Sequence, residues 1–299
     1  MDLEKRKLSI GASEAAAVLG LSKYRTPLEV YMEKTGQLPA KEPNFNMALG
    51  NLLEPIIAQL FEIETTLPVV KNDVVYLHKD YSFISATPDY FVKSIYFYTK
   101  DSLSLVECKS TGFRNKDRFE NGEVPMEIAV QCLMQMEVYS SWANMDTLER
   151  VYVPVLFTDS TFEIFEVRRN DELQKEILEK LVYFWRENIE KRIPPDVTAQ
   201  DTELLKKLYP VAQETIVLLD DSFEDLIITR EELKKNIKEF QVEIDLIENQ
   251  LKTQIKENET GLTSLYKIDW TNVNRKGYEV KPAAYRQFKI KKRFKDLKI

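Results

Sequence analysis

Two acids and a lysine lie at a spacing that could support hydrolysis of a phosphodiester. Asp89 ends the stretch ATPD, and eighteen residues further on Glu107 begins the stretch ECK, which ends at Lys109. Side chains two residues apart on a strand point to the same face, so we expect Glu107 and Lys109 to lie together and Cys108 to face the opposite, apolar side. The pattern predicts a site where two carboxylates and one cation converge.

The chemistry that fits such a site is metal-assisted hydrolysis. Carboxylate oxygens are preferred ligands of Mg²⁺, which would polarise the phosphate and lower the pKa of a bound water. Lys109 would orient or deprotonate that water and counter the charge on the phosphate. The carbonyl of Cys108 and the carboxylate of Glu54, on the preceding helix, are further oxygen donors. The alternative is a solvent-facing ion pair between Glu107 and Lys109, worth about 0–1 kcal/mol.

Residue counts exclude several other classes of protein. One histidine, His78, among 299 residues excludes a His-rich zinc site and argues against catalysis built on a histidine base. Two cysteines do not make a disulfide framework and indicate a reducing, cytoplasmic setting. No apolar run reaches the roughly 20 residues of a membrane span, and the N-terminus has no secretory signal. With 43% apolar residues, the chain can build a sizeable core.

Several segments together resemble the YqaJ-type viral recombinase family, relatives of phage lambda exonuclease in the PD-(D/E)xK nuclease superfamily. The N-terminal segment reads IGASEAAAVLG from Ile10, followed by YRTP and EKTG. GNLLEP from Gly50, ATPD, ECK and QCLMQM from Gln131 complete the pattern. Each piece is weak alone, but their order and spacing agree over about residues 6–168.

The resemblance implies a role for each matching position of the metal centre. Asp89 and Glu107 are then the metal ligands, together with the carbonyl of Cys108, and Lys109 is the catalytic lysine. The implied ion is Mg²⁺, with Mn²⁺ as an alternative.

Four further positions match residues placed around the centre in this family. Glu54 matches an acid on a helix near the metal, and Gln131 matches a glutamine beside the active site. Arg6 and Ser13 match the pair that grips the DNA 5′-phosphate. Plain alternatives stay open: a frayed basic terminus for Arg6, a helix cap for Ser13 or Glu54, and a surface position for Gln131.

The implied function is that of a phage-type, Mg²⁺-dependent exonuclease. It would degrade linear double-stranded DNA from its ends, 5′-to-3′, and leave 3′ single strands for a single-strand annealing protein in recombination. A homo-oligomer, a trimer by resemblance, in the cytoplasm of the host cell is the implied assembly. Two alternatives are an endonuclease or nickase of the same fold, and a catalytically inactive coiled-coil DNA-binding scaffold.

The elements that must position these residues follow from periodicity. Helical spacing and caps predict helices over residues 13–21, 26–34, 47–64, 125–142 and 171–191. Alternation predicts strands over 69–77, 83–86, 90–98, 103–108, 149–157 and 161–168. We therefore expect an α/β (α+β) fold with a PD-(D/E)xK restriction-endonuclease-like core, a central mixed sheet flanked by helices. Residues 1–195 would be the nuclease domain, with Pro194 and Pro195 in the linker.

The C-terminal region, residues 196–299, combines a long helix with a basic tail. Over 223–255, apolar residues alternate steps of four and three from Leu233 to Leu251, a seam of about three heptads that could pair within the chain or with another subunit. Short strands are expected around Ser264, Glu279 and Phe288. Residues 267–299 carry a net charge of +8 and the remainder −15, which favours contact with a polyanion such as DNA; a solvated charged edge is the alternative.

Overall fold

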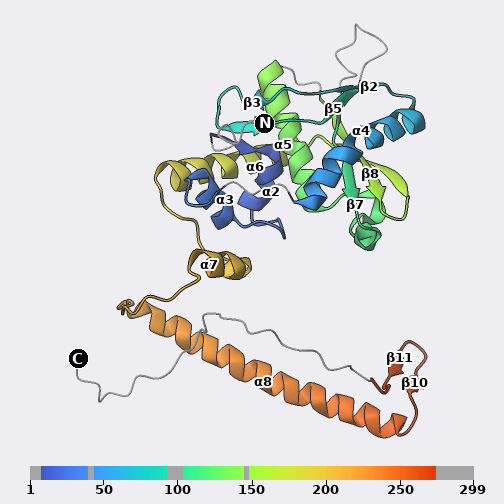
Figure 1. Ribbon diagram of the computed structural model, residues 1–299, viewed down its shortest axis with the longest axis vertical. Helices are drawn as coiled ribbons and strands as arrows, with labels where there is room; N and C mark the ends of the chain where they lie inside the picture. Colours follow the sequence, from blue (N-terminus) through green and yellow to red (C-terminus); the bar gives the residue numbers. More distant parts are fainter. Residues whose placement is uncertain (1–7, 40–43, 93–103, 145–147, 274–299) are drawn as a thin grey trace. The chain divides into compact units, whose positions relative to one another are not determined.

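The computed structural model describes residues 8–39, 44–92, 104–144 and 148–273 (Figure 1). The chain forms two compact units, Met1–Leu205 and Lys206–Ile299. The expected strand region 93–98, the N-terminal Arg6 and the tail beyond residue 273 lie outside the described residues. No helix in the described part of the chain is long and apolar enough to cross a membrane.

A central mixed sheet of six strands organises the first unit. Its strands are β2 (Val69–Lys71), β5 (Tyr90–Val92), β6 (Leu105–Val106), β7 (Lys109–Thr111), β8 (Arg150–Phe157) and β9 (Phe162–Arg168). β5 pairs antiparallel with both β2 and β6, while β8 pairs parallel with β6 and β7 and antiparallel with β9. The expected α+β class with a central mixed sheet is confirmed.

β6 and β7 form one line with a gap. They pair with β8 at a constant offset, from Leu105 opposite Val151 to Lys109 opposite Val155. In the gap, the N–H of Glu107 still donates to a β8 carbonyl oxygen over 2.9 Å. The chain therefore keeps its direction through the two residues that separate β6 from β7. The strand expected over 103–108 is therefore interrupted at residues 107 and 108, and the same line continues as β7 to Thr111.

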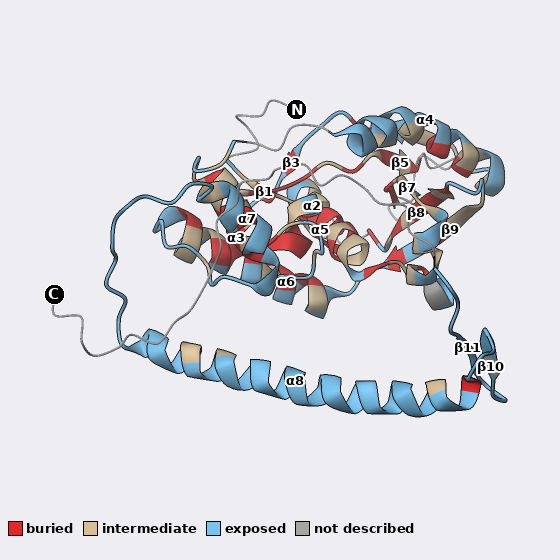
Figure 2. Cartoon of the chain, turned by 60° about the horizontal axis from the view of Figure 1, so that its bottom comes forward, coloured by how far each residue is buried: buried red, intermediate tan, exposed pale blue. Residues whose placement is uncertain are grey.

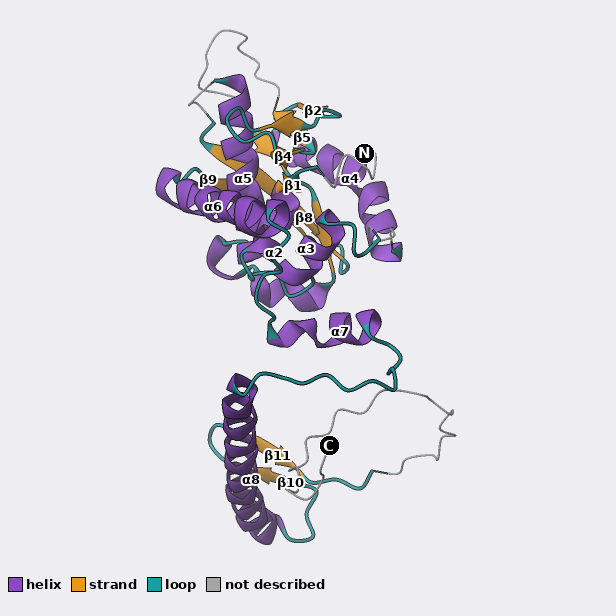
Figure 3. Cartoon of the chain, turned by 90° about the vertical axis from the view of Figure 1, so that its left-hand side faces the viewer, coloured by secondary structure: helices purple, strands orange, loops and turns teal. Residues whose placement is uncertain are grey.

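Helices cover both faces of this sheet. Figure 3 shows the strands between α4 (Phe45–Thr65) on one side and α5 (Met126–Ala143) and α6 (Asp171–Tyr183) on the other. α4 begins after Asn44, whose side chain accepts the N–H of Met47, and it runs through Pro55 as a single helix. α5 begins after a proline and ends at a left-handed asparagine, Asn144. The expected helices are therefore present with small shifts of their ends.

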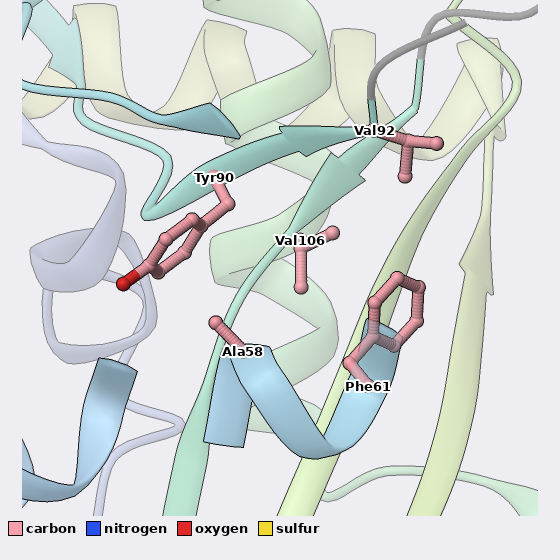
Figure 4. Packing of buried hydrophobic residues seen from close by; sticks show 5 residues of the cluster. All are labelled: Ala58, Phe61, Tyr90, Val92 and Val106. Carbon is pink, nitrogen blue, oxygen red and sulfur yellow. The ribbon is translucent and has the colours of Figure 1, made fainter. Parts of the chain in front are cut away.

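An apolar cluster fixes α4 against the sheet. Ala58 and Phe61 of α4 pack against Tyr90 and Val92 of β5 and Val106 of β6 (Figure 4). Burial of such side chains contributes about 1.5–3 kcal/mol for each large one. Position 108 also packs its side chain against this cluster. The opposite face is thereby left for positions 107 and 109, as their spacing predicts.

The first strand of the described chain belongs to a second, smaller sheet of three strands. β4 (Ile84–Ala86) pairs parallel with β1 (Ile10–Gly11) and antiparallel with β3 (Tyr76–Leu77). The single strand expected over residues 69–77 is wrong, because this stretch divides between the two sheets. The turn between the two parts is fixed by Asn72, whose side chain bonds to the backbone of Val74.

Short helices complete the first unit. α2 (Ala12–Val18) follows β1 directly, and α3 (Pro27–Lys34) is capped by Thr26, which accepts the N–H of Glu29. Two 3₁₀-helices, η2 (Phe113–Arg118) and η3 (Glu120–Gly122), connect β7 to α5. α6 continues as the π-helix η4 (Phe184–Glu190) instead of remaining α-helical to residue 191.

The first compact unit extends past the expected boundary at residue 195. The 3₁₀-helix η5 (Ala199–Asp201) and the start of α7 (Thr202–Leu208) follow the proline pair. Asp201 is fully buried, and its carboxylate accepts the hydroxyl of Thr26 over 2.5 Å. A buried, charge-assisted hydrogen bond of this kind ties residues beyond the prolines to the cap of α3.

The second unit contains a long helix and a hairpin. α8 (Ser222–Ile255) confirms the expected long helix, and β10 (Thr260–Leu262) pairs antiparallel with β11 (Lys267–Asp269). The strand expected around Ser264 is wrong, because that residue lies in the turn between β10 and β11. The segments expected around Glu279 and Phe288 lie outside the described residues.

Candidate active site

Asp89 lies immediately before β5, opposite the gap between β6 and β7. Its Oδ2 atom accepts the backbone N–H of Cys108 over 2.8 Å, so the Asp89 carboxylate replaces a backbone partner at the interrupted strand. Asn72 fixes the backbone of Pro88 and Asp89 through two hydrogen bonds. The Asn72 N–H donates to the Asp89 carbonyl, and its amide group donates to the Pro88 carbonyl, each over 2.9 Å.

The Asp89 carboxylate is in an environment that disfavours its negative charge. Burial raises its pKa well above the ordinary range, and the nearby carboxylates of Glu107 and Glu54 add to the shift. A bound cation would remove this repulsion. The clustering of acids therefore favours a positively charged ligand at this place.

Glu107 is buried and receives three side-chain donors. Lys109 and Gln131 donate to its Oε1 atom, each over 2.6 Å, and Gln135 donates to its Oε2 atom over 2.6 Å. Gln131 also accepts a hydrogen bond from Lys109 over 3.1 Å. The two glutamines lie one turn apart on α5, so the helix that covers this face of the sheet fixes the carboxylate.

Lys109 carries a stable positive charge in this arrangement. Burial alone would lower its pKa, but Glu107 and Asp89 outweigh burial and hold the pKa above its ordinary value. Lys109 is therefore protonated at neutral pH and can donate hydrogen bonds to an anion. The spacing-based expectation that Glu107 and Lys109 share a face agrees with this geometry.

Glu54 lies near the two central acids but bonds elsewhere. Its carboxylate forms an ion pair with Lys71 of β2 over 3.5 Å. The negative charge of Glu54 nevertheless raises the pKa of Asp89. Burial raises the pKa of the Tyr90 phenol to about 12, and Glu54 makes the largest contribution among the neighbouring charges. Glu54 therefore contributes negative potential to the site from α4.

Side-chain ligands alone do not complete a metal centre here. Within the described ranges, no group of three His, Cys, Asp or Glu side chains is arranged to hold an ion. A carboxylate has about four lone-pair positions, and the Oε2 atom of Glu107 accepts a hydrogen bond from Gln135 alone among the described side chains. A hard cation could thus bind Asp89 and Glu107, with backbone carbonyl and water oxygens filling its remaining positions. The donor set consists of oxygens, which fits Mg²⁺.

The N-terminal pair is only half described. Ser13 is exposed in the first turn of α2, and Arg6 lies outside the described residues. The alternative that Ser13 caps this helix is wrong, because the cap residue is Gly11. Its N–H donates to the carboxylate of Glu14 over 3.0 Å. The Ser13 hydroxyl is thereby left available to solvent.

Two residues of the site were not assigned a role from the sequence. Gln135 is part of the glutamine motif, and its spacing of four from Gln131 is a signal that both could reach one group. Gln135 is 1% exposed, and its Oε1 atom is buried without a partner among the described residues. Gln131 is half-buried, and its side chain donates to Glu107, so neither glutamine is a free surface residue. Asn72 carries no sequence signal, because its contact with Asp89 arises only from tertiary packing.

A pocket of about 800 Å³ elsewhere in the first unit contains none of these residues. It is lined in part by His78, Tyr81, Glu137 and Arg186. His78 is buried, and its Nδ1 atom accepts the N–H of Tyr81 over 3.3 Å. His78 lies apart from the candidate site, and the candidate chemistry rests on the acids beside the central sheet.

Known structures share the fold of about two thirds of the chain. The alkaline exonuclease LHK-Exo from Laribacter hongkongensis has a TM-score of 0.50 at 21% sequence identity, covering 69% of this chain and 95% of that chain. LHK-Exo in complex with dAMP has a TM-score of 0.51 at 20% identity, with the same coverage. The fold is therefore that of this class of alkaline exonucleases.

Sequence comparison identifies the family. Residues 3–146 match the YqaJ-like viral recombinase domain. The protein YqaJ of Bacillus subtilis (strain 168) is 30% identical over 275 residues, which covers 91% of this chain and 82% of that protein. The chain belongs to the YqaJ family, as the resemblance of its motifs implied.

Proposed function

We propose that this protein is a metal-dependent exonuclease that hydrolyses linear double-stranded DNA from its ends. The observation that carries the proposal is the convergence of Asp89, Glu107 and Lys109 at one interrupted strand, with Gln131 holding the central carboxylate. Membership of the YqaJ family and the fold shared with an alkaline exonuclease support it.

Asp89, Glu107 and the carbonyl of Cys108 would hold Mg²⁺, or Mn²⁺ in its place. Such an ion supplies polarisation of the phosphate and a lowered pKa of bound water. The fit rests on the two carboxylates: burial raises the pKa of Asp89, repulsion from Glu107 raises it further, and both effects favour a cation. Glu54 adds negative potential without needing to be a ligand.

The protein's own groups then orient the substrate and stabilise developing charge. Gln131 and Gln135 hold the Glu107 carboxylate in one orientation from α5. The Lys109 ammonium, kept protonated by its acidic neighbours, donates to the phosphate and counters the charge that develops there. This assigns Lys109 an electrostatic role instead of removal of a proton.

The DNA end would be recognised through its 5′-phosphate. Arg6 and Ser13 are the proposed contacts, since a guanidinium and a hydroxyl both donate to phosphate oxygens. Cleavage would proceed 5′-to-3′ and leave a 3′ single strand, the substrate of a single-strand annealing protein. A homo-oligomeric assembly in the cytoplasm, a trimer by family resemblance, completes the proposal.

The experiment compares linear duplex with covalently closed circular duplex of the same sequence. The proposal predicts that Mg²⁺ supports stepwise release of nucleotides from the linear DNA, with the circle left intact. Cleavage of the closed circle would establish an endonuclease or nickase instead. Absence of cleavage with both substrates, despite DNA binding, would establish an inactive scaffold.

A further inference from the structure

α8 exposes an apolar seam along most of its length. Six side chains on this helix are 40% to 66% exposed and recur at steps of four and three: Leu233, Ile237, Phe240, Ile244, Ile247 and Leu251. Figure 2 shows the helix as exposed over nearly all of its turns. Within the second unit, the described residues leave this seam exposed, and a helix with such a stripe is expected to bury it against a partner.

The heptad positions of α8 can be assigned from these steps. Leu233, Phe240 and Ile247 occupy d positions, and Ile237, Ile244 and Leu251 occupy a positions. Extended by one step at each end, the seam contains two polar residues, Arg230 at an a position and Gln254 at a d position. The flanking positions include Lys234 and Glu248 at e and Glu243 at g.

A parallel pair of two copies would bring like charges together. In register, it would place Arg230 against the partner's Arg230 in the seam, where a charge is costly to bury. It would also place Glu243 beside the partner's Glu248, twice in each dimer. Both contacts are repulsive.

An antiparallel pair gives the same polar and charged residues complementary partners. With the two-fold axis level with Val242, Arg230 lies opposite the partner's Gln254, so the two polar seam residues meet each other. The apolar layers then match apolar layers, such as Phe240 with the partner's Ile244. At the e positions, Lys234 lies beside the partner's Glu248, twice in each dimer, and the remaining repulsion is a single contact of Glu243 with its own copy.

A shift of one heptad removes these matches. It would place Arg230 opposite the partner's Ile247 in one direction, or Ile237 opposite the partner's Gln254 in the other. Each shift leaves a polar side chain facing an apolar one, which costs free energy on burial. The charge and polarity pattern therefore selects one orientation and one register.

We propose that α8 joins two copies of this chain as an antiparallel coiled coil with its axis at Val242. The occupant of the seam is thus a second copy, chosen by the pairing of Arg230 with the partner's Gln254 and of Lys234 with the partner's Glu248. The proposal is independent of the chemistry at Asp89 and Glu107. It is also compatible with the proposed trimer, because three such α8 pairs would join two trimers, and breaking the pairs would halve the mass.

The first test is sedimentation equilibrium of the full chain and two matched variants. Ile244→Lys inserts a charge into both central layers, whereas Val242→Lys inserts the same charge on the outer face, where Val242 is 67% exposed. We expect the average mass of Ile244→Lys to fall twofold relative to the wild type, and that of Val242→Lys to stay unchanged. Equal masses for all three proteins would overturn the proposal, because the seam would then be covered within the chain or left unused.

The second test separates the two orientations by charge. In the antiparallel pair, Glu248→Lys places lysine beside the partner's Lys234 and weakens dimerisation by roughly tenfold, and the added change Lys234→Glu restores it. In a parallel pair, Glu248→Lys would instead remove the repulsion with the partner's Glu243 and strengthen dimerisation. Lys235→Glu, on the outer face, is the control and should have little effect.

The third test measures distances between spin labels in the dimer. Labels on Val242→Cys should lie at the same level in both copies. Labels on Lys235→Cys should be offset along the axis by about 21 Å, from fourteen residues at about 1.5 Å each. A short distance at both positions would indicate a parallel pair and contradict the proposal. The wild-type protein, labelled in the same way, corrects for its native cysteines.

Discussion

The Nζ atom of Lys109 lies 2.6 Å from Oε1 of Glu107, two residues earlier, where the strand between β6 and β7 is interrupted. The interruption lets the intervening N–H of Cys108 turn to the carboxylate of Asp89. A continuous ladder would satisfy that N–H with backbone and would leave Asp89 without its partner. The break in the sheet is therefore what brings the second carboxylate to the Glu107–Lys109 pair.

Lys109→Gln should lower the cleavage rate by about 10²–10³-fold, the effect of removing one charged donor from a reacting phosphate. The affinity for Mg²⁺ should change much less, because an ammonium is not a metal ligand. Single-turnover rates and Mg²⁺ titrations check both statements. Lys180→Gln, an exposed lysine of α6, is the control. A wild-type rate for Lys109→Gln would remove this residue from the site.

Asn72→Ala should impair metal binding at the site, although Asn72 is not proposed to contact the substrate. The buried amide holds the carbonyl of Pro88, and its loss leaves that segment free to move Asp89. We expect a loss of about 1–3 kcal/mol in the free energy of unfolding. The Mg²⁺ concentration needed for half-maximal rate should also rise, which a purely structural role would not produce. An unchanged Mg²⁺ requirement would show that Asn72 does not position Asp89.

Glu14→Gln should destabilise the protein in a pH-dependent way. Glu14 pairs with buried Lys34 over 2.6 Å and with Arg25 over 3.2 Å. Burial would raise its pKa, but Lys34 and Arg25 outweigh burial and hold the pKa below the ordinary value. A lowered folded-state pKa stabilises the fold above the unfolded-state value, and this stabilisation is lost as pH falls through the folded-state pKa.

The expected cost of Glu14→Gln at neutral pH is about 3 kcal/mol, since a buried cation loses its partner. Chemical denaturation at pH 7 and at successively lower pH measures the difference from the wild type. It should shrink as the wild-type carboxylate becomes protonated. Glu64→Gln, an exposed change of the same kind, should show little difference at any pH. A difference independent of pH would contradict the charge-pair explanation.

Ser13→Ala should reduce a preference for 5′-phosphorylated ends. Wild-type protein is expected to degrade linear duplex with a 5′-phosphate faster than the same duplex with a 5′-hydroxyl, and Arg6→Ala should remove much of that difference. The exposed hydroxyl of Ser13 is available for such a contact. Ser9→Ala changes a nearby hydroxyl that bonds to Ser85, and serves as the control. Equal wild-type rates on both ends would refute the assignment.

Local patterns in the sequence were sufficient to predict which of the candidate residues share a face. The spacing of Glu107 and Lys109 places them on one face, and their shared hydrogen bond agrees. The spacing of Gln131 and Gln135 places both on one side of a helix. These relations depend on neighbours within a few residues, so periodicity is enough to find them.

Contacts between distant segments could not be predicted in this way. Asn72 reaches Pro88 only because β2 and β5 pair, and the same packing divides the stretch 69–77 between two sheets. Asp201 is buried against Thr26 across 175 residues, so the proline pair does not end the first unit. Such contacts come from tertiary packing, which overrides local propensity.

The most direct measurement is the rate of nucleotide release from end-labelled linear duplex in Mg²⁺ by wild-type protein and by Asp89→Asn. Asp73→Asn, an exposed change in the same segment, is the matched control. We expect wild-type and Asp73→Asn proteins to release nucleotides at similar rates, and Asp89→Asn to be slower by at least about 10³-fold, with DNA binding in Ca²⁺ retained. Nucleotide release by Asp89→Asn at the wild-type rate would contradict the assignment of the active site.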